Sequence, residues 1–236
     1  MDIEYEIPGG QRMGYLARPT SAEIAPGILV LHGGGGIGPH AKHRADMLAA
    51  MGYVAFVPDL FGHPVRGVEA AEALVAELIE NWADLRARCT VALDVLRRQS
   101  QVDPERLAAI GFCFGGQAAL ELGRSGADLR AIIGFHPQLR TCRPEDSIHI
   151  KAKVLVCLGD RDRFVSRDER EAFLENMTTC RVDCQLLLFS GVGHSFTDRL
   201  AEKSGVPGLK YDARADRRAW TAMAQLLSEA FESEDE

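Results

Sequence analysis

The residue of this sequence best suited to covalent chemistry is a cysteine set among glycines. Cys113 stands in the run Gly-Phe-Cys-Phe-Gly-Gly (111–116), after an apolar stretch typical of a buried strand (107–110) and before a helical pattern (114–123). A sharp strand-to-helix turn exposes the residue at its tip and needs small neighbours there. The N-terminus of the following helix lowers the pKa of a thiol, and the thiolate is the nucleophilic form. The same run also fits a glycine-rich turn around an inert buried cysteine, so it needs partners to indicate catalysis.

Two polar loops supply the partners that a nucleophile needs. His194 lies in Gly-Val-Gly-His-Ser-Phe (191–196), after an apolar run, and a histidine on such a loop can act as a general base. Asp160 and Asp162 follow another apolar run, and either carboxylate could orient the imidazole. A lone loop histidine is more often a plain surface residue, and loop aspartates often only cap turns. The order nucleophile, acid, base, each at the end of a strand, is that of the α/β-hydrolase fold, and this coincidence favours the catalytic interpretation.

A glycine-rich loop offers hydrogen-bond donors for a developing oxyanion. The run His-Gly-Gly-Gly-Gly (32–36) follows the first long strand-like run, where this fold supplies one backbone N–H of an oxyanion hole. The residue after the nucleophile supplies the other. The sequence therefore predicts the N–H of Phe114 together with that of Gly33 or Gly34. A dinucleotide-binding interpretation of the same glycines is weak, because no acidic residue closes the next strand in the required role.

The elements that must position these residues alternate along the chain. Strand-like apolar runs occupy 27–32, 53–57, 107–110, 131–135, 154–158 and 185–189, and helical spacing occupies 40–51, 68–98 (as two helices), 114–123, 168–177 and 213–231. The alternation predicts an α/β fold with a mostly parallel central sheet flanked by helices. A hairpin of 5–7 and 13–16, turned at 8–10, is expected at one sheet edge, and a short turn or helix is expected from Asp103. We expect a single domain over 1–236 without a large lid domain, ending in a frayed acidic tail at 232–236.

Charge and composition limit the classes of partner. The 236 residues are 46% hydrophobic and 26% charged, with a formal net charge of −7 and a pI of about 5.6. This balance argues against nucleic acid or an anionic membrane surface as a main partner. No apolar run is long enough to span a bilayer, and the acidic N-terminus lacks the pattern of a signal peptide. We therefore expect a cytoplasmic protein, a monomer or small homo-oligomer, that acts on a small molecule.

Most other cysteines and histidines are expected to be inert. The sequence holds 6 cysteines but no C-x-x-C pair, and a chain of this size does not need disulfides. His40 and His43 have the helical spacing of a metal-binding pair, but no third ligand accompanies them, so both are expected to be surface histidines. Trp82 lies at helical spacing with other apolar residues and is expected in the core. The sequence predicts no metal and no cofactor.

Four short motifs occur in order over nearly the whole chain: Pro-Asp-Leu-Phe (58–61), Gly-Phe-Cys-Phe-Gly-Gly (111–116), Gly-Asp-Arg-Asp (159–162) and Gly-His-Ser-Phe (193–196). In these motifs the chain resembles the dienelactone hydrolase family, whose members are carboxymethylenebutenolidase-like proteins. The resemblance implies a Cys113–His194–Asp162 triad in a compact domain without a large lid. It also implies hydrolysis of a small-molecule ester or lactone through a thioester acyl-enzyme.

Two positions depart from the best-known members of that family. Those members carry a glutamate that restrains the resting cysteine where this chain has Gly33, so Cys113 must be controlled otherwise. They bind a substrate carboxylate with an arginine where this chain has Asp198, with Arg199 one step later. A neutral or differently charged ester is therefore expected in place of a dienelactone. Candidate pocket residues, besides Phe114, are His32, Phe61, His136, Phe196 and Arg199.

Three other functions remain open from the sequence. The same thiolate site could attack the phosphorus of a phosphotriester. A peptidase related to the prolyl-oligopeptidase group is disfavoured by the cysteine nucleophile and by the lack of a propeller or lid domain. A catalytically silent ligand-binding homologue is disfavoured because a complete set of catalytic residue types is present.

Overall fold

The computed structural model describes residues 1–7 and 10–232, and its centre is one eight-stranded sheet in the order β1-β2-β4-β3-β5-β6-β7-β8. The strands are β1 Asp2–Ile7, β2 Gly10–Ala17, β3 Ala25–Leu31, β4 Val54–Val57, β5 Val102–Phe112, β6 Ala131–Phe135, β7 Lys153–Gly159 and β8 Cys184–Phe189. β2 pairs antiparallel with β1 and with β4, and every other neighbouring pair is parallel. The predicted mostly parallel sheet and N-terminal hairpin are confirmed, and residues 8 and 9 of the expected hairpin turn lie outside the described residues.

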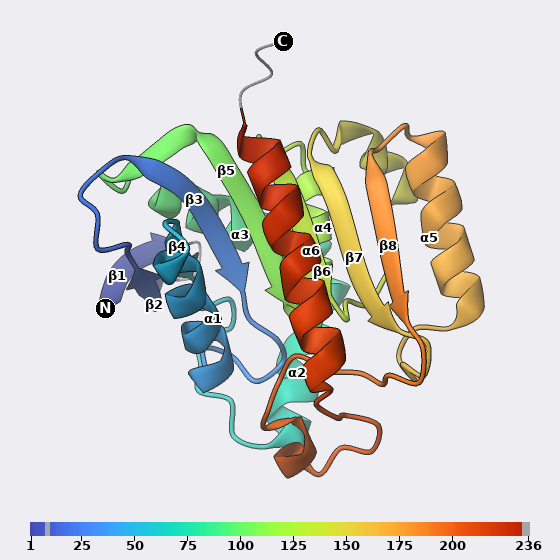
Figure 1. Cartoon of the computed structure of the whole chain (residues 1–236). Coiled ribbons are helices and arrows are strands. Elements are labelled where there is room, and N and C mark those ends of the chain that lie inside the picture. The colour runs from blue at the N-terminus through green and yellow to red at the C-terminus, as the bar shows by residue number, and fades with distance from the viewer. Residues whose placement is uncertain (8–9, 233–236) are drawn as a thin grey trace.

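Helices cover both faces of this sheet (Figure 1). They are α1 Pro39–Ala50, α2 Val68–Glu80, α3 Trp82–Arg97, α4 Phe114–Arg124, α5 Arg167–Thr179 and α6 Ala213–Phe231, with short 3-10 helices η1 Pro144–His149 and η2 Ala201–Ser204. Side chains of α1 and α6 pack into the apolar cluster on one face, whereas α3, α4 and α5 pack into the cluster on the other. Because helices bury both faces of the parallel strands, the side chains on both faces are apolar, and the strand sequences do not alternate between apolar and polar residues.

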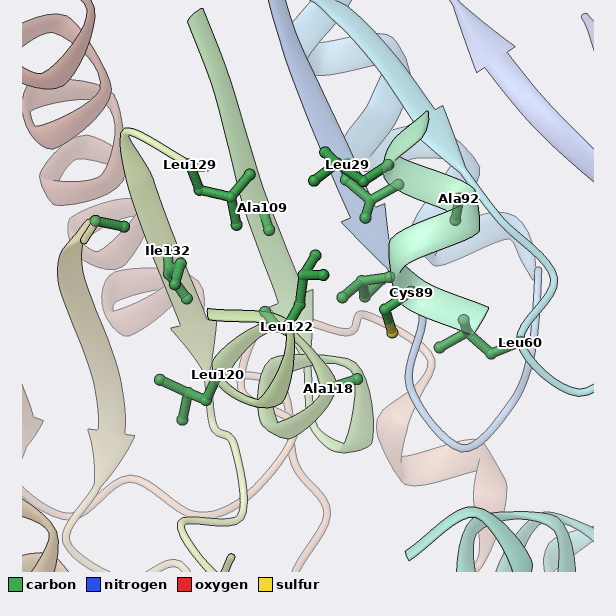
Figure 2. Packing of buried hydrophobic residues seen from close by; sticks show 14 of the residues in the cluster. Leu29, Leu60, Cys89, Ala92, Ala109, Ala118, Leu120, Leu122, Leu129 and Ile132 are labelled. Atoms are coloured by element: carbon green, nitrogen blue, oxygen red, sulfur yellow. The ribbon is translucent and has the colours of Figure 1, made fainter. Parts of the chain in front are cut away.

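Figure 2 shows the cluster that fixes α3 and α4 to the central strands. Cys89 of α3 and Leu122 of α4 belong to it with Leu29 of β3 and Ala109 of β5, and all four are fully buried. Burying one leucine side chain contributes roughly 1.5–3 kcal/mol, so a cluster of this kind holds α4 firmly against the sheet. Trp82, the first residue of α3, is half-buried against the same cluster, in agreement with its expected core position.

Strand β5 is longer than the sequence predicted, and the turn or helix expected from Asp103 is wrong. That segment lies within the strand. The pairing with β3 jumps from Asp103 to Leu107, so residues 104–106 bulge out of the ladder. Asp103 Oδ1 accepts a hydrogen bond from the Glu105 N–H at 3.0 Å, which gives the bulge a turn-like geometry. The turn chemistry was therefore present, but the strand continues through it.

The carboxyl ends of the parallel strands meet at one edge of the sheet, at the lower side in Figure 1. The loops that follow β3, β5, β7 and β8 therefore converge there, although the strands are far apart in the sequence. Among the described residues, no helix is both long and apolar enough to cross a membrane. Of the expected acidic tail at 232–236, only Glu232 lies within the described residues.

Candidate active site

Cys113 occupies the sharp turn between β5 and α4. Its backbone has φ 54° and ψ −120°, a left-handed conformation that few non-glycine residues adopt. Two glycines allow the turn: a Cβ on Gly111 would collide with the carbonyl of Gly115, and a Cβ on Gly115 would collide with the carbonyl of Leu31 on β3. The Cys113 N–H donates to the Phe135 carbonyl at 2.9 Å, which ties the turn to β6. The sulfur is thus held at the sheet edge, at the N-terminus of α4.

His194 and Asp162 lie in line with the cysteine. His194 Nε2 is 3.1 Å from Cys113 Sγ, and His194 Nδ1 is 2.7 Å from Asp162 Oδ2. The second oxygen of Asp162 accepts the Phe164 N–H at 2.9 Å, so the carboxylate is fixed at both ends. The side chains of His194 and Asp162 are 2% and 0% exposed. The geometry therefore allows a proton to pass between the Cys113 sulfur and the His194 imidazole, while the partner carboxylate of the imidazole is shielded from solvent.

The structure gives different partners to Asp160 and Asp162, the two acids that the sequence motif left as alternatives for orienting the imidazole. Asp160 Oδ1 accepts the Gly191 N–H at 2.6 Å and thereby braces the loop after β8. Only Asp162 contacts His194. The first aspartate is a structural residue of the loop, and the second is the one placed to orient the imidazole.

Electrostatics favour a charged resting pair. Burial alone would raise the pKa of the Cys113 thiol, but the neighbouring His194 outweighs it and the pKa lies below the ordinary value. Burial alone would lower the pKa of His194, but the Cys113 thiolate and the Asp162 carboxylate raise it well above the ordinary value. The two shifts agree with each other, since each charge stabilises the other. Both shifts favour the form in which a Cys113 thiolate faces a His194 imidazolium.

Two backbone amides act on the same sulfur. The N–H groups of Phe114 and Gly34 both contribute, as backbone hydrogen-bond donors, to lowering the Cys113 pKa. The carbonyl of Gly33, the residue that offers the other candidate N–H, accepts the Gly36 N–H at 3.1 Å in the turn after β3. The electrostatics therefore link Phe114 and Gly34, two of the three residues expected to offer an N–H to an oxyanion, to the Cys113 sulfur.

A cavity of about 620 Å³ opens in front of Cys113. Its floor carries His194, His136 and the glycines after β3, and one wall comes from α2 and the residues before it. The apolar side chains of that wall are Val65, Val68, Ala71 and Val75, and the segment after His194 adds Leu200, Ala201, Val206 and Leu209. The charged residues in the lining are Glu72, Asp198 and Lys203. Most of the lining is thus apolar, as it usually is in small-molecule sites.

A model of the dienelactone hydrolase family matches residues 13–231 of this chain. The chain belongs to the dienelactone hydrolase family. A solved dienelactone hydrolase-like promiscuous phosphotriesterase from metagenomic libraries is 36% identical, with a TM-score of 0.93 and coverage of 98% of this chain and 97% of that one. The solved protein m3DLH is 39% identical, with a TM-score of 0.94 and coverage of 98% of each chain. Protein usf of Aquifex pyrophilus is 27% identical over 235 residues, which are 96% of this chain and 97% of the relative.

Family membership makes the protein a dienelactone hydrolase-like hydrolase with the α/β-hydrolase fold, as the sequence predicted. The position that holds a glutamate in the best-known members is Gly33 here, and a Cβ there would lie 3.6 Å from the Cβ of Cys113. No side chain from this position reaches the sulfur. The Cys113 sulfur instead has His194 Nε2 as its neighbour at 3.1 Å.

Four of the predicted pocket residues do not line the cavity. His32 is buried behind it, where Nδ1 lies 2.8 Å from the Gly33 carbonyl and Nε2 accepts the Leu60 N–H at 3.1 Å. Phe61 stacks on Phe114 and packs in the core behind the wall. Phe196 is fully buried in the core on the α6 side, and the exposed Arg199 lies over the ring of Tyr211. Each of these residues follows a strand that ends near the cavity, but its side chain points elsewhere. The direction of a side chain could not be predicted from the sequence pattern.

The cavity contains His136, as predicted, and His40, for which the prediction of a surface residue is wrong. His40, on the first turn of α1, contacts the loop that carries His194, with Nε2 3.2 Å from the Thr197 carbonyl. His43 is exposed, as expected. The sequence pattern did not predict the role of Thr197, which contacts both His136 and His40. Its position three residues after His194 is a signal that could have indicated it. Among residues 1–7 and 10–232, no cluster of three side chains suited to a metal ion occurs.

Proposed function

We propose that this protein hydrolyses neutral carboxylic esters or lactones by covalent catalysis at Cys113. The observation that carries the proposal is the aligned chain Asp162–His194–Cys113, with contacts of 2.7 and 3.1 Å, together with the N–H groups of Phe114 and Gly34 that help to lower the Cys113 pKa. A thiolate in such a site is a competent nucleophile, and preorganised amides stabilise the charge that develops on the carbonyl oxygen.

In the first half of the reaction the Cys113 thiolate attacks the ester carbonyl carbon, and the carbonyl electron pair moves to oxygen. The N–H groups of Phe114 and Gly34 hold this oxyanion. The oxyanion collapses, the bond to the alkoxy group breaks, and the His194 imidazolium gives its proton to the leaving alcohol. A thioester on Cys113 and a neutral His194 remain.

In the second half His194 removes a proton from a water molecule as that water attacks the thioester carbonyl. The same amides hold the second oxyanion, and its collapse releases the acid and the Cys113 thiolate. The proton stays on His194, opposite the Asp162 carboxylate, so the resting ion pair is restored. Asp162 keeps its charge throughout and fixes the imidazole orientation.

The lining favours an uncharged substrate. The position at which the resemblance places a carboxylate-binding arginine holds Asp198, which lines the cavity, whereas Arg199 points away. Of the three charged residues in the lining, Glu72 and Asp198 are acidic and Lys203 is basic, so a substrate carboxylate would meet more negative than positive charge there. Apolar groups of an ester, in contrast, can lie against the wall formed by α2.

The direct test is turnover of p-nitrophenyl butyrate by Cys113→Ala, with Cys142→Ala as the matched control because Cys142 is free and exposed. Loss of the nucleophile removes covalent catalysis, so we expect at least a 10³-fold fall in kcat for the first variant and wild-type rates for the second. The matched ester mono-p-nitrophenyl succinate should show a lower kcat/KM than the butyrate. Wild-type turnover by Cys113→Ala would contradict the proposal.

A second candidate activity is cleavage of phosphotriesters at the same site. It is favoured by the 36% identical relative that is described as a promiscuous phosphotriesterase. Here the thiolate would attack phosphorus and displace an aryloxide, and the same amides would hold the phosphoryl oxygen. Parallel assays on a diethyl aryl phosphate and the butyrate ester separate the possibilities, because both activities must vanish together in Cys113→Ala if they share the nucleophile.

A further inference from the structure

His136 lies beside the catalytic histidine, but the reaction described above gives it no role. It follows β6 directly, lines the cavity and is 2% exposed. Its φ is 42°, which makes it one of four non-glycine residues with positive φ in the described chain; two others, Cys113 and Ser195, also line this cavity. Such conformations cost free energy and persist where the surrounding structure enforces them, so they concentrate at functional sites.

The ring of His136 packs on the catalytic imidazole. The centroids of His136 and His194 are 4.9 Å apart with an interplanar angle of 63°, and those of Phe164 and His194 are 4.7 Å apart at 60°. Edge-to-face contacts of this kind fix the tilt of a ring more narrowly than ordinary apolar packing does. His194 is thus oriented by a carboxylate along its plane and by two rings across it.

A polar chain ties His136 to the loop that carries His194. His136 Nε2 is 2.8 Å from Thr197 Oγ1, three residues beyond His194. Arg44 Nη2 donates to the Thr197 carbonyl at 2.7 Å and is paired with Asp216 of α6 at 2.6 Å. Thr197 is therefore bound by His136, which follows β6, and by Arg44 of α1, whose partner Asp216 belongs to α6. These contacts fix one end of the loop that carries His194.

Thr197 is also contacted by His40 of α1. His40 Nε2 lies 3.2 Å from the Thr197 carbonyl and 3.3 Å from Thr197 Oγ1. Arg44 Nε donates to the same His40 nitrogen at 3.5 Å. His136 Nδ1, the other ring nitrogen of His136, is buried without a hydrogen-bond partner among the described residues, so the Thr197 hydroxyl is the group through which the polar contacts reach the His136 ring.

His136 remains uncharged in this setting. Burial lowers its pKa well below the ordinary value, and the positive charges of His194 and Arg44 act in the same direction. Asp162 and Asp216 are paired with these two cations, His194 and Arg44, and not with His136. A neutral ring can lie against the His194 imidazolium, whereas a second imidazolium would repel it.

We propose that His136 is a positioning residue: through its ring and through the hydroxyl of Thr197 it holds His194 in the orientation that keeps Cys113 ionised. This inference rests on the proposed function for its catalytic consequence. Its first consequence, the ionisation of Cys113, needs no substrate and can be measured separately.

The experiment compares Thr197→Val, which removes the hydroxyl at nearly constant shape, with Thr197→Ser, which keeps it, and with His136→Phe, which keeps a neutral ring. We expect Thr197→Val and His136→Phe to lower kcat on p-nitrophenyl butyrate about 10–100-fold with KM within twofold. The pH midpoint of Cys113 alkylation by iodoacetamide should move up toward the ordinary thiol value. Thr197→Ser should restore both quantities. Because the two residues act through one hydrogen bond, the double variant should be no worse than the poorer single one.

Unchanged kcat and an unchanged alkylation midpoint in folded Thr197→Val would overturn the inference, and so would fully additive losses in the double variant. If His136→Phe does not fold, Thr197→Val carries the test alone, because it leaves the strained position untouched. Failure of the proposed function is distinguishable, since it appears as ester turnover by Cys113→Ala, whereas the alkylation midpoint still reports on His194.

Discussion

Helix α4 behind Cys113 and helix α2 along the cavity wall are anchored to the sheet to very different degrees. Every residue of α4, from Phe114 to Arg124, is buried, and the helix lies over the central strands (Figure 2). In α2 only Leu78 is buried, and the helix begins after Gly67 without a side-chain cap. The catalytic end of the cavity is therefore built on the most deeply embedded helix, and the wall that would contact a substrate is built on a superficial one.

The difference in burial between α4 and α2 suggests that the two helices serve different steps, the reaction and the binding of substrate. Proton transfer between His194 and Cys113 depends on atoms held at 3.1 Å, and small displacements cost rate steeply. An apolar wall needs only shape and area, and it can move without disturbing the reacting atoms. Substitutions near α4 should therefore change kcat or stability, whereas substitutions on the cavity face of α2 should change KM.

The largest effect is expected when the anchored side of the site loses its acid. Asp162→Asn removes the charge that helps keep the pKa of His194 high, so the pKa of Cys113 rises and less thiolate is present at neutral pH. We expect kcat to fall by ~10²–10⁴ and the pH midpoint of Cys113 alkylation to shift upward. Because the thiol pKa is depressed in the wild type, wild-type alkylation should stay fast below the ordinary thiol pKa of about 8.5 and decline only at lower pH.

The matched control is Asp160→Asn, two residues earlier in the same loop. An asparagine oxygen can still accept the Gly191 N–H, so turnover and the alkylation midpoint should stay close to wild type. Equal losses in the two variants would show that the loop as a whole, and not the carboxylate of Asp162, sets the activity.

The sequence predicted the anchored region well because its signals are local. The glycines around Cys113 are typical of a sharp strand-to-helix turn. The acid and the base each follow a strand, and the ends of parallel strands meet at one edge of the sheet. The choice between Asp160 and Asp162 could not be made from the pattern, since both are loop aspartates at the same strand end. The choice required the distance from each carboxylate to His194, and this distance depends on how two loops 32 residues apart in the sequence are folded.

The lining was predicted poorly because it depends on the direction of single side chains. Phe61 and Phe196 follow the correct strands, but each fills a core cluster, because burial of an aromatic ring there outweighs its exposure in the cavity. For His40 the sequence predicted a surface position, because no third metal ligand accompanies His40 and His43. The contact that brings it to the cavity joins residues 157 positions apart and has no local signature.

A smaller effect should separate the two helices in stability. Leu122→Ala on α4 leaves a cavity at a fully buried position and should lower the free energy of unfolding by about 2–5 kcal/mol. Leu74→Ala on α2 removes the same atoms from a half-buried position, and we expect a loss of about 1 kcal/mol or less. Urea denaturation followed by circular dichroism measures both. Similar losses would mean that α2 is anchored as firmly as α4 and that the contrast between the helices is wrong.

The smallest effect should appear at the wall itself. Val75→Ala removes two methyl groups from the lining of the cavity. If one of them is buried against the substrate, the loss is roughly 0.8 kcal/mol, so KM for p-nitrophenyl butyrate should rise about fourfold while kcat stays within twofold. The shorter acetate ester should respond less, because it reaches less of the wall. Val91→Ala on α3 is the same change at a half-buried position behind the site, and it should leave both constants unaltered. A fall in kcat without a change in KM for Val75→Ala would mean that α2 positions the reacting groups, and the wall would then belong to the catalytic machinery.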